Sequence, residues 1–502
     1  MAKFFIFFLV TFLVFFIVPF IILNISLIDI VLSIPNLFSF LANNFFPANF
    51  AALEGNFTVI KNTILFAIVG TVISSTIAFF LAILMSRSFN KFLFIRILVK
   101  FIASFFRNVP IVVWASILVF IFGIGPLVGV IALVLGGIGF LARSYSETID
   151  EIYKTKLESL KSTGASYFQI IFHGLFPLFI KPWLNLTLFA LEINVRLSAI
   201  LGMVGAGGLG LLISANLDLR NFRRAMALII VLIIIVLVTE FLTNKLREYV
   251  EKDFPYFLLF LFIIAIYLFS VNSLNISLNS FLERASGAPR IISLFMTFNI
   301  ELTFEILNAL FISILLAIAG LGLGVFVSFF LSFLSAKNTA PIKILAILIK
   351  TFIAILRAIP SLIIILMAVS SLGFGEVSAV IGITFSSLGY LTKVFTATIE
   401  EENHEKIEAL KSTGASYFQV IYHGILPRTR NSFMSWISLR LEANISDGIA
   451  LGVVSAGGIG TLMARAIRIH DFEFLSSSIL IIFVFMLFLE FLTSKIKSFN
   501  RE

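Results

Sequence analysis

The chain has 502 residues, of which 60% are hydrophobic and only 13% are charged. Its mean hydropathy of +1.11 is too high for a soluble domain of this length, so the composition indicates a polytopic membrane protein. The sequence contains no cysteine, which excludes disulfides, thiolate metal sites and cysteine nucleophiles. The net charge of +9 requires no nucleic-acid partner, because positively charged cytoplasmic loops account for it.

Long uninterrupted apolar runs predict membrane-spanning helices rather than the alternating strands of a barrel. A helix needs about 20 such residues to cross about 30 Å of hydrocarbon. The first run is longer than the core of a secretory signal and no small-residue cleavage site follows it, so we interpret it as a retained span. The predicted spans of the N-terminal half are 4–23, 57–85, 101–122, 127–142, 183–203 and 225–243.

Lysine and arginine set the orientation of these spans, since short cytoplasmic loops carry the excess of positive charge. Three clusters fall on one side of the predicted spans: Arg87, Lys91, Arg96 and Lys100; Lys154, Lys156 and Lys161; Lys245, Arg247 and Lys252. We expect this side to be cytoplasmic. Segments 24–56 and 204–224 are then outside, and both chain ends are cytoplasmic.

A polar segment of ten residues occurs twice, 250 positions apart, at Leu160–Gln169 and Leu410–Gln419. Over the longer stretches 158–177 and 408–427, 15 of 20 positions are identical. The chain is therefore interpreted as two copies of one unit. The predicted copies are residues 1–250 and 251–502.

Six is an even number of spans, so the second copy enters the membrane in the same orientation and the two repeats are parallel. We expect an all-α protein of about twelve transmembrane helices, with both polar segments in the cytoplasm. The predicted spans of the second copy lie near 255–271, 305–335, 351–372, 377–392, 433–453 and 474–492.

The repeated segment predicts two short helices joined at a glycine. Residues 158–163 form the first helix, Gly164 breaks it, and residues 165–174 form the second, which Pro177 ends before the chain re-enters the membrane. Such a pair can fit a groove on a partner and transmit its motion, whereas the alternative is an ordinary interfacial loop. Near identity of the copies favours a shared partner, although a recent duplication leaves the same trace.

The residues Glu158-Ser-Leu-Lys-Ser-Thr-Gly164 and Glu408-Ala-Leu-Lys-Ser-Thr-Gly414, each followed by a proline, resemble the EAA loop of permease subunits of binding-protein-dependent ABC importers. In that family the loop is the coupling helix that binds the nucleotide-binding subunit. The resemblance implies coupling roles for Glu158, Leu160, Gly164, Ala165, Tyr167 and Pro177, and for Glu408, Leu410, Gly414, Ala415, Tyr417 and Pro427.

Further passages are similar to the phosphonate-type branch of these permeases. The first copy contains Arg107-Asn-Val-Pro110, Gly123-Ile-Gly-Pro126, Glu192-Ile-Asn-Val-Arg196 with Ser198–Leu201, and the glycine-rich passage Gly202–Gly210. The second copy repeats them as Arg357-Ala-Ile-Pro360, Gly373-Phe-Gly375, Leu441-Glu-Ala-Asn444 and Gly452–Gly460. The resemblance covers nearly the whole chain except the first span of each half and the loop after it. It implies the type I ABC importer permease fold in each half.

The implied function is the permease of an ATP-driven importer for phosphonate or a related phosphorus oxyanion, in the bacterial plasma (inner) membrane. The chain contains no G-x-x-x-x-G-K-[ST] loop, so ATP hydrolysis is expected on separate cytoplasmic subunits, two in number, with a substrate-binding protein outside. We expect no covalent chemistry and no cofactor. The sequence leaves the cargo open among phosphonate, phosphite, phosphate and larger phosphorylated compounds.

Two other patterns are interpreted as structural. Gly205, Gly207 and Gly210 match the spacing of a dinucleotide fingerprint, but they follow a span rather than a strand. We expect these glycines to allow a tight turn and a close approach of helices. The four histidines have no metal-ligand spacing, so no metal site is predicted.

Charged residues inside spans cost at least about 2.5–3.5 kcal/mol each at a helix centre. Arg107, Arg196 and Arg357 are assigned to a translocation path, where guanidinium groups meet an anion, with structural pairing as the alternative. Glu192 and Glu442 are interpreted as structural partners of arginines, and Arg440 is a further charged residue in a span. The path assignment also includes Pro110, Asn194, Pro360 and Asn444, the prolines being expected to kink their spans.

The two copies differ at one of these passages, because Ser446-Asp447 replaces Arg196-Leu197. If that arginine contacts substrate, the halves are not equivalent. The alternative function is a secondary transporter of twelve spans driven by an ion gradient, which also has parallel six-span halves. Such a carrier has no need of two identical docking loops, and the spans contain no acidic proton relay.

Overall fold

The structure is a computed structural model that describes residues 16–157, 164–252, 256–274, 278–402, 408, 410, 412–451 and 457–499. Every regular element within these ranges is a helix. The chain forms two compact units. We call Phe45–Met296 the first unit, and Met1–Asn44 together with Thr297–Glu502 the second unit.

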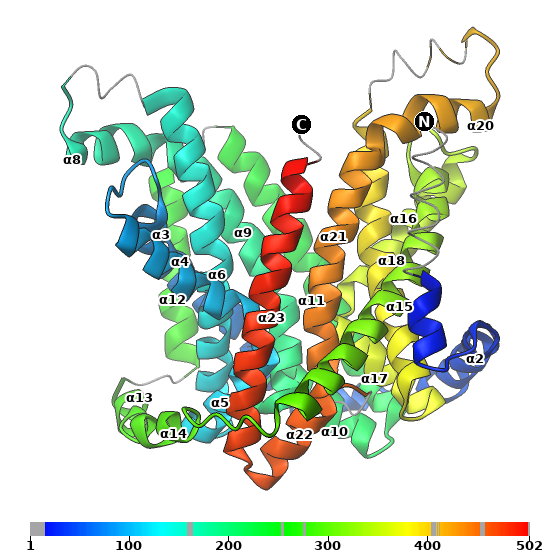
Figure 1. Cartoon of the computed structure of the whole chain (residues 1–502), viewed down its shortest axis with the longest axis horizontal. Helices are drawn as coiled ribbons and strands as arrows, with labels where there is room; N and C mark the ends of the chain where they lie inside the picture. Colours follow the sequence, from blue (N-terminus) through cyan, green and yellow to red (C-terminus); the bar gives the residue numbers. More distant parts are fainter. Residues whose placement is uncertain are drawn as a thin grey trace. The chain divides into compact units, whose positions relative to one another are not determined.

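The first unit is built on the apolar runs of the first copy, which are helical because a backbone in hydrocarbon must satisfy its own N–H and C=O groups. Its helices are α3 (Phe57–Met85), α4 (Leu93–Asn108), α5 (Ile111–Phe122), α6 (Pro126–Ile152), α8 (Tyr167–Gln169), α9 (Phe176–Leu201), α10 (Leu209–Asp218), α11 (Phe222–Glu251), α12 (Tyr256–Ser273), α13 (Leu278–Ala285) and α14 (Ala288–Leu294) (Figure 1).

The second unit repeats this order of helices. They are α2 (Leu27–Phe40), α15 (Thr303–Ser335), α16 (Lys343–Ala358), α17 (Ser361–Leu372), α18 (Glu376–Glu400), α20 (Tyr417–Gln419), α21 (Leu426–Leu451), α22 (Ile459–Ile469) and α23 (Phe472–Phe499). The central packing of the first unit is between α3 and α6, and that of the second unit is between α15 and α18. In each pair the second helix is the one that precedes the polar segment.

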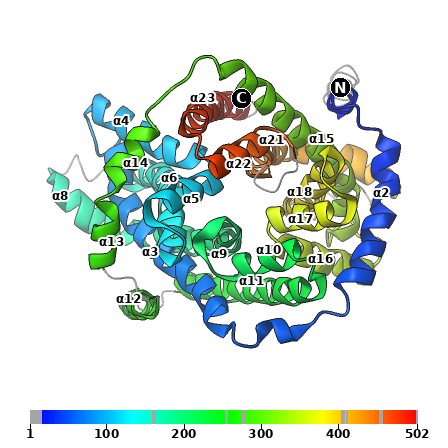
Figure 2. The ribbon, with the colours of Figure 1, turned by 90° about the horizontal axis from the view of Figure 1, so that it is seen from below.

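Each unit takes its outer helices from the opening segment of the other copy. Helix α2 packs against α17 and α18 of the second unit, where Phe38 meets Phe385 edge-on at 6.1 Å between ring centroids (Figure 2). Helices α12, α13 and α14 pack against α3 and α5 of the first unit. The compact units are therefore offset from the sequence repeats, because the opening segment of each copy leaves its own core.

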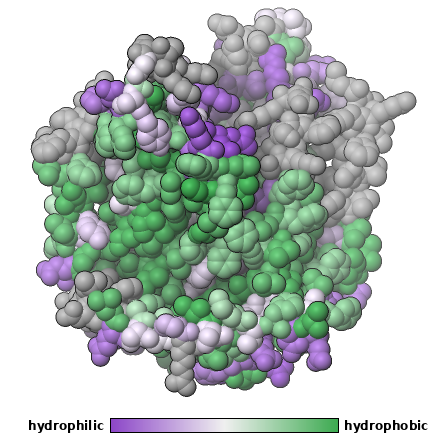
Figure 3. All heavy atoms as spheres, turned by 60° about the vertical axis from the view of Figure 1, so that its left-hand side comes forward, coloured by the Kyte–Doolittle hydropathy of each residue, from purple (hydrophilic) through white to green (hydrophobic). Residues whose placement is uncertain are grey.

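Eight helices of the described residues are long and apolar enough to cross a membrane, or up to ten if each of two bent pairs counts as one span. The predicted total of about twelve is higher. Most of span 4–23 lies outside the described residues, α12 offers only a shorter apolar stretch, and α21 carries too many charges to qualify. Leu27–Phe45, predicted to be part of an outer loop, is instead among the eight. On the face in Figure 3 an apolar belt separates hydrophilic ends.

Both predicted proline kinks are larger than a bend within one helix. Helices α4 and α5 meet at 91°, and α16 and α17 meet at 90°. Pro110 and Pro360 stand at the N-caps of α5 and α17, where a missing N–H costs nothing because the first turn of a helix has free donors anyway. The two predicted spans are thus each a broken pair of helices.

Hydroxyl groups from α3 and α15 fix the short helices that follow the glycine-rich passages. The backbone N–H of Leu209 donates to Thr63 Oγ1 at 2.8 Å, and that of Ile459 donates to Ser313 Oγ at 2.9 Å. Both helices start after a glycine, which has no side chain with which to cap them. A hydroxyl on a neighbouring span therefore satisfies the free donor in each unit.

A serine and a glycine exchange places between the copies where the central helices cross. In the first unit Ser74 of α3 faces Gly137 of α6, and a Cβ on Gly137 would lie 2.6 Å from Ser74 Oγ. In the second unit the glycine is Gly324 of α15 and the serine is Ser387 of α18, with 2.6 Å between a Cβ on Gly324 and Ser387 Cβ. Each crossing has room for only one side chain.

We predict that Gly137→Ser destabilises the first unit by about 1–3 kcal/mol, because both facing positions would then carry a side chain. Unfolding by detergent titration of the purified chain measures this change. The companion change Ser74→Gly in the same chain is expected to recover most of the loss, and Ser74→Gly alone serves as the control. A Gly137→Ser chain as stable as the wild type contradicts the assignment.

Candidate functional site

The polar segment of the first copy begins, in the described residues, at a left-handed glycine. Gly164 has φ +79°, a conformation that costs a residue with a Cβ roughly 1–2 kcal/mol. Ser166 then caps the next helix, since its Oγ accepts from the N–H of Gln169 while Gln169 Oε1 accepts from the N–H of Ser166 at 2.8 Å. Glu158 and Leu160 lie outside the described residues.

The second copy repeats this geometry. Gly414 has φ +80°, and Ser416 and Gln419 form the same reciprocal cap, with 2.7 Å from the Ser416 N–H to Gln419 Oε1. Glu408 is exposed, and Leu410 packs on the apolar cluster that contains Val420. Two segments 250 residues apart therefore share the same backbone turn and the same cap.

The predicted end of the second short helix at Pro177 is wrong. Helix α8 continues through a π-helical stretch, Ile170–Leu175, into α9, so the segment from Tyr167 to Ala206 is one helical run. Pro177 lies in the first turn of α9 and Pro427 follows the corresponding stretch, Val420–Ile425. In a π-helical turn the backbone hydrogen bonds are shifted by one residue. A proline, which has no N–H to donate, can therefore follow such a turn within one helical run.

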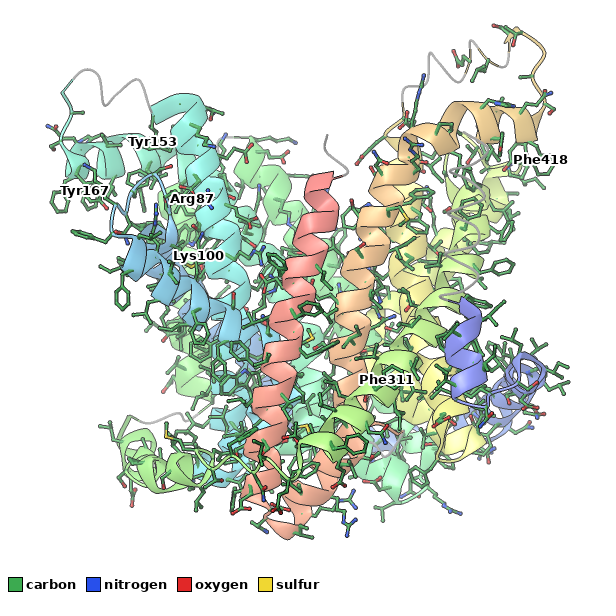
Figure 4. All side chains as sticks on the ribbon, in the orientation of Figure 1. Arg87, Lys100, Tyr153, Tyr167, Phe311 and Phe418 are labelled. Carbon is green, nitrogen blue, oxygen red and sulfur yellow. The ribbon has the colours of Figure 1, made fainter. Side chains whose placement is uncertain are left out.

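Each segment has one buried face and one exposed aromatic face. Leu175 and Ile425 are fully buried in their units, and Ala165 and Ala415 are half-buried against the same clusters. The exposed aromatic residues are Tyr167, Phe168 and Phe172 in the first copy and Tyr417, Phe418 and Tyr422 in the second. Phe168 is 69% exposed and Phe418 is 78% exposed (Figure 4). These faces are apolar, rigidly held and open to a partner.

A carboxylate at the end of the preceding helix holds the neighbouring loop beside each segment. In the first unit Asp150 accepts from Ser86 Oγ at 2.6 Å and from the N–H of Ser88 at 3.0 Å. In the second unit Glu400 accepts from the N–H of Lys337 at 2.8 Å and from Lys350 Nζ at 2.6 Å. We call these contacts the carboxylate braces.

In the first unit the braced loop also contacts the polar segment. Tyr167 packs against Phe89 of the braced loop, with 6.0 Å between ring centroids, and Phe89 packs against Tyr153 at 5.4 Å. In Figure 4, Arg87, Lys100 and Tyr153 lie at the same end of the first unit as Tyr167. The sequence patterns above did not single out Asp150 and Glu400. Both are acidic, they are 250 residues apart like the polar segments, and each lies shortly before its segment, which could have indicated a shared role.

Of the assigned path residues, Arg107, Pro110, Arg357 and Pro360 lie at the two broken helix pairs, whereas Arg196 lies in α9. Arg107 is in the last turn of α4 and Arg357 in the last turn of α16, and both are half-buried. A Cβ on Gly139 of α6 would lie 2.6 Å from the backbone N of Arg107, so α4 and α6 are nearly in backbone contact there. At the same glycine position in the second copy, a Cβ on Gly389 would lie 3.5 Å from the backbone N of Arg357.

The two asparagines assigned to the path are buried and bonded to neighbouring helices. Asn194 Nδ2 donates to Thr71 Oγ1 at 2.8 Å, and Asn444 Nδ2 donates to Ser387 Oγ at 2.8 Å. They thus connect α9 with α3 and α21 with α18. Their observed contacts hold helices together.

Glu192 pairs with an arginine in the first unit, as the structural interpretation requires. Its Oε2 lies 3.0 Å from Arg247 Nη2, and its side chain is 8% exposed. The pair joins α9 to α11. Arg196, four residues along α9, is half-buried.

The glycine passages of the first copy contact one another, as expected for a tight turn with close packing. The N–H of Gly125 donates to the carbonyl of Gly205 at 3.0 Å, and Gly205, Gly207 and Gly208 all have positive φ. Gly202 and Gly210 have no room for a Cβ. Residues 452–456 of the second passage lie outside the described residues. Across the described ranges, no group of three His, Cys, Asp or Glu side chains is arranged to hold a metal ion.

Comparisons with known proteins agree with this duplicated organisation. Residues 77–256 and 328–497 each match the family described as binding-protein-dependent transport system inner membrane component. The phosphate-import permease protein PhnE of Mycolicibacterium smegmatis is 26% identical over 451 residues, which cover 87% of this chain and 84% of that protein. Similarity over that share of both chains means that the relative is double-length too.

Two further relatives match one copy each. The phosphite transport system permease protein PtxC of Stutzerimonas stutzeri is 30% identical over 33% of this chain and 61% of its own length. The methionine import system permease protein MetP of Bacillus subtilis is 30% identical over 28% of this chain and 69% of its own length. The chain is thus a transport component that is not itself catalytic. It belongs to the family of binding-protein-dependent transport system inner membrane components, and it carries the permease domain of that family twice.

Proposed function

We propose that the chain supplies both permease halves of an ATP-driven importer for phosphonate or a related phosphorus oxyanion. The duplicated segment carries the proposal, since two copies with the same turn, cap and exposed aromatic face fit two copies of one cytoplasmic partner. The family works with a binding protein. Relatives named for phosphate and phosphite support a phosphorus oxyanion as cargo.

In this function each exposed aromatic face binds one of two separate ATPase subunits, and a cargo-loaded binding protein docks outside. Glu158, Leu160, Gly164, Ala165, Tyr167 and Pro177 form the coupling segment of the first copy, and Glu408, Leu410, Gly414, Ala415, Tyr417 and Pro427 form that of the second. Both segments and both chain ends are cytoplasmic, in a bacterial plasma membrane. Six spans in each repeat, residues 1–250 and 251–502, make the two repeats parallel and give this orientation.

Motion of the ATPase subunits reaches the spans through short, stiff connections. Each coupling segment is continuous with a long helix on one side and follows, on the other, a helix whose end is joined by a carboxylate brace to a neighbouring loop. Those loops lead into the broken pairs α4–α5 and α16–α17, whose corners at Pro110 and Pro360 are places where direction can change without breaking helical bonds. Arg107 and Arg357 at these corners, with Arg196, present positive charge to an anion.

We predict that phosphorus oxyanions, and not methionine, stimulate ATP turnover by the reconstituted complex. The measurement uses the chain with its ATPase subunits and binding protein in proteoliposomes, with phosphonate, phosphite, phosphate or methionine added outside. Methionine is the informative contrast because a methionine permease is among the relatives. Stimulation by methionine alone contradicts the cargo assignment. Uptake that persists without ATPase subunits contradicts the importer and favours the gradient-driven carrier.

A second prediction concerns the left-handed turns. The double change Gly164→Pro with Gly414→Pro removes both left-handed turns, because proline is fixed near φ −65° and cannot adopt a positive φ. We expect binding-protein stimulation of ATP turnover to fall to the basal rate while the chain still inserts into the membrane. Gly55→Pro is the matched control, since Gly55 has φ +73° and, like Gly164, nothing within 4 Å of a Cβ. Wild-type stimulation in the double variant excludes the coupling role.

A further inference from the structure

A half-buried polar cluster lies among three helices of the second unit. Arg440 of α21 donates from Nη2 to Ser386 Oγ of α18 at 2.7 Å, and the same nitrogen lies 3.5 Å from Asp447 Oδ2. The guanidinium also stands 5.6 Å from the ring centroid of Tyr390, one turn beyond Ser386. The side chain of Ser361, the first residue of α17, is a polar neighbour of the Asp447 carboxylate.

The first copy has an apolar residue or a glycine at every corresponding position. Subtracting 250 from each number gives Ala190, Gly136, Leu197, Phe140 and Ile111. Ala190 and Phe140 belong to one apolar cluster of the first unit, and Leu197 and Ile111 belong to another. Five substitutions on three helices thus replace an apolar contact region by an ion pair with hydrogen-bonding neighbours.

The first copy therefore serves as an internal control for what the fold requires. At the five corresponding positions the same helices pack there without a charged residue, so this ion pair is not needed to build this part of the structure. A buried pair is a weak source of stability, since the desolvation of two charges offsets their attraction and apolar replacements are often neutral or stabilising. Ionisable groups within membrane spans more commonly mark ligand pathways.

The guanidinium retains unused binding capacity. Arg440 Nε is buried and has no hydrogen-bond partner, and the 3.5 Å contact with Asp447 is longer than the 2.7–2.9 Å of a good charge-assisted bond. The Arg440 side chain is 11% exposed, whereas that of Asp447 is 31% exposed. The carboxylate thus lies on the more open side of the pair, where an incoming anion would meet it first.

We propose that Arg440 binds the oxyanion cargo in the second copy and that Asp447 is the resident counter-ion which the cargo replaces. This assignment rests on the proposed function, because it takes a phosphorus oxyanion as the cargo. A tetrahedral oxyanion offers two oxygens to the planar guanidinium fork and can reach both Nε and Nη2. Without cargo, Asp447 compensates the positive charge of Arg440. Once a cargo anion is bound, the Asp447 carboxylate repels a second anion.

The test is the double change Arg440→Ala with Asp447→Leu, which installs the first copy's own pair. The chain is reconstituted with its ATPase subunits and binding protein, and uptake of labelled phosphate, phosphite and methylphosphonate is measured together with ATP hydrolysis. We expect the number of ATP molecules hydrolysed per oxyanion transported to rise about tenfold or more, because the loss of one charge-assisted hydrogen bond weakens cargo binding by about that factor. Arg468→Ala, an exposed arginine of α22, is the control.

The outcomes separate a cargo contact from a structural pair. Wild-type uptake in the double variant, or an equal fall of uptake and ATP hydrolysis, overturns the proposal. Should the double variant fail to assemble, Arg440→Lys decides, since lysine keeps the charge but not the fork, and an unchanged ATP-to-cargo ratio overturns the proposal. If the wild-type complex transports none of the three oxyanions, the cargo assignment fails instead, which the same measurement shows before any variant is made.

Discussion

Within hydrocarbon no water is present to bond a free backbone group, and this constraint decides where the helices of the molecule can be interrupted. At three of the interruptions within the described residues a named group takes over. Thr63 and Ser313 accept the first donors of α10 and α22, and the carbonyl of Gly205 accepts from Gly125. At Pro110 and Pro360 the donor is simply missing. The breaks are thus confined to places where bonding remains complete, and these are the places at which the fold can change direction.

The two copies are most alike at the polar segment and least alike deep within the spans. Between the copies the φ of the left-handed glycine changes from +79° to +80°, and the distance from the serine N–H to the glutamine Oε1 changes from 2.8 Å to 2.7 Å. In contrast, the cluster around Arg440 has only apolar counterparts in the first copy. Such a distribution agrees with the proposed function, in which two like ATPase subunits meet two like surfaces while the interior need not be symmetric. Fusion of both copies in one chain permits that difference, since each half then changes independently of the other.

Much of the candidate site was readable from the sequence because its determinants are local. A glycine that needs positive φ and a serine three residues before a glutamine act over a few residues, and the ten-residue repeat marks both. The helix end predicted at Pro177 was wrong because a π-helical stretch accommodates the proline. The backbone pattern of that stretch has no clear sequence signal. The braces of Asp150 and Glu400 were missed because their partners are 50 or more residues away in the sequence.

The sequence by itself determined the helical membrane class, the duplication and the family resemblance, because apolar length, repetition and motif spacing are properties of the chain alone. Only the tertiary structure decided that α2 and α12 pack on the unit built from the other copy, and that Ser74 and Gly137 are mirrored by Gly324 and Ser387. It also decided that Glu192 pairs with Arg247 and Arg440 with Asp447. These facts depend on which surfaces meet across helices distant in sequence, and steric fit and charge pairing exist only once those surfaces are in contact.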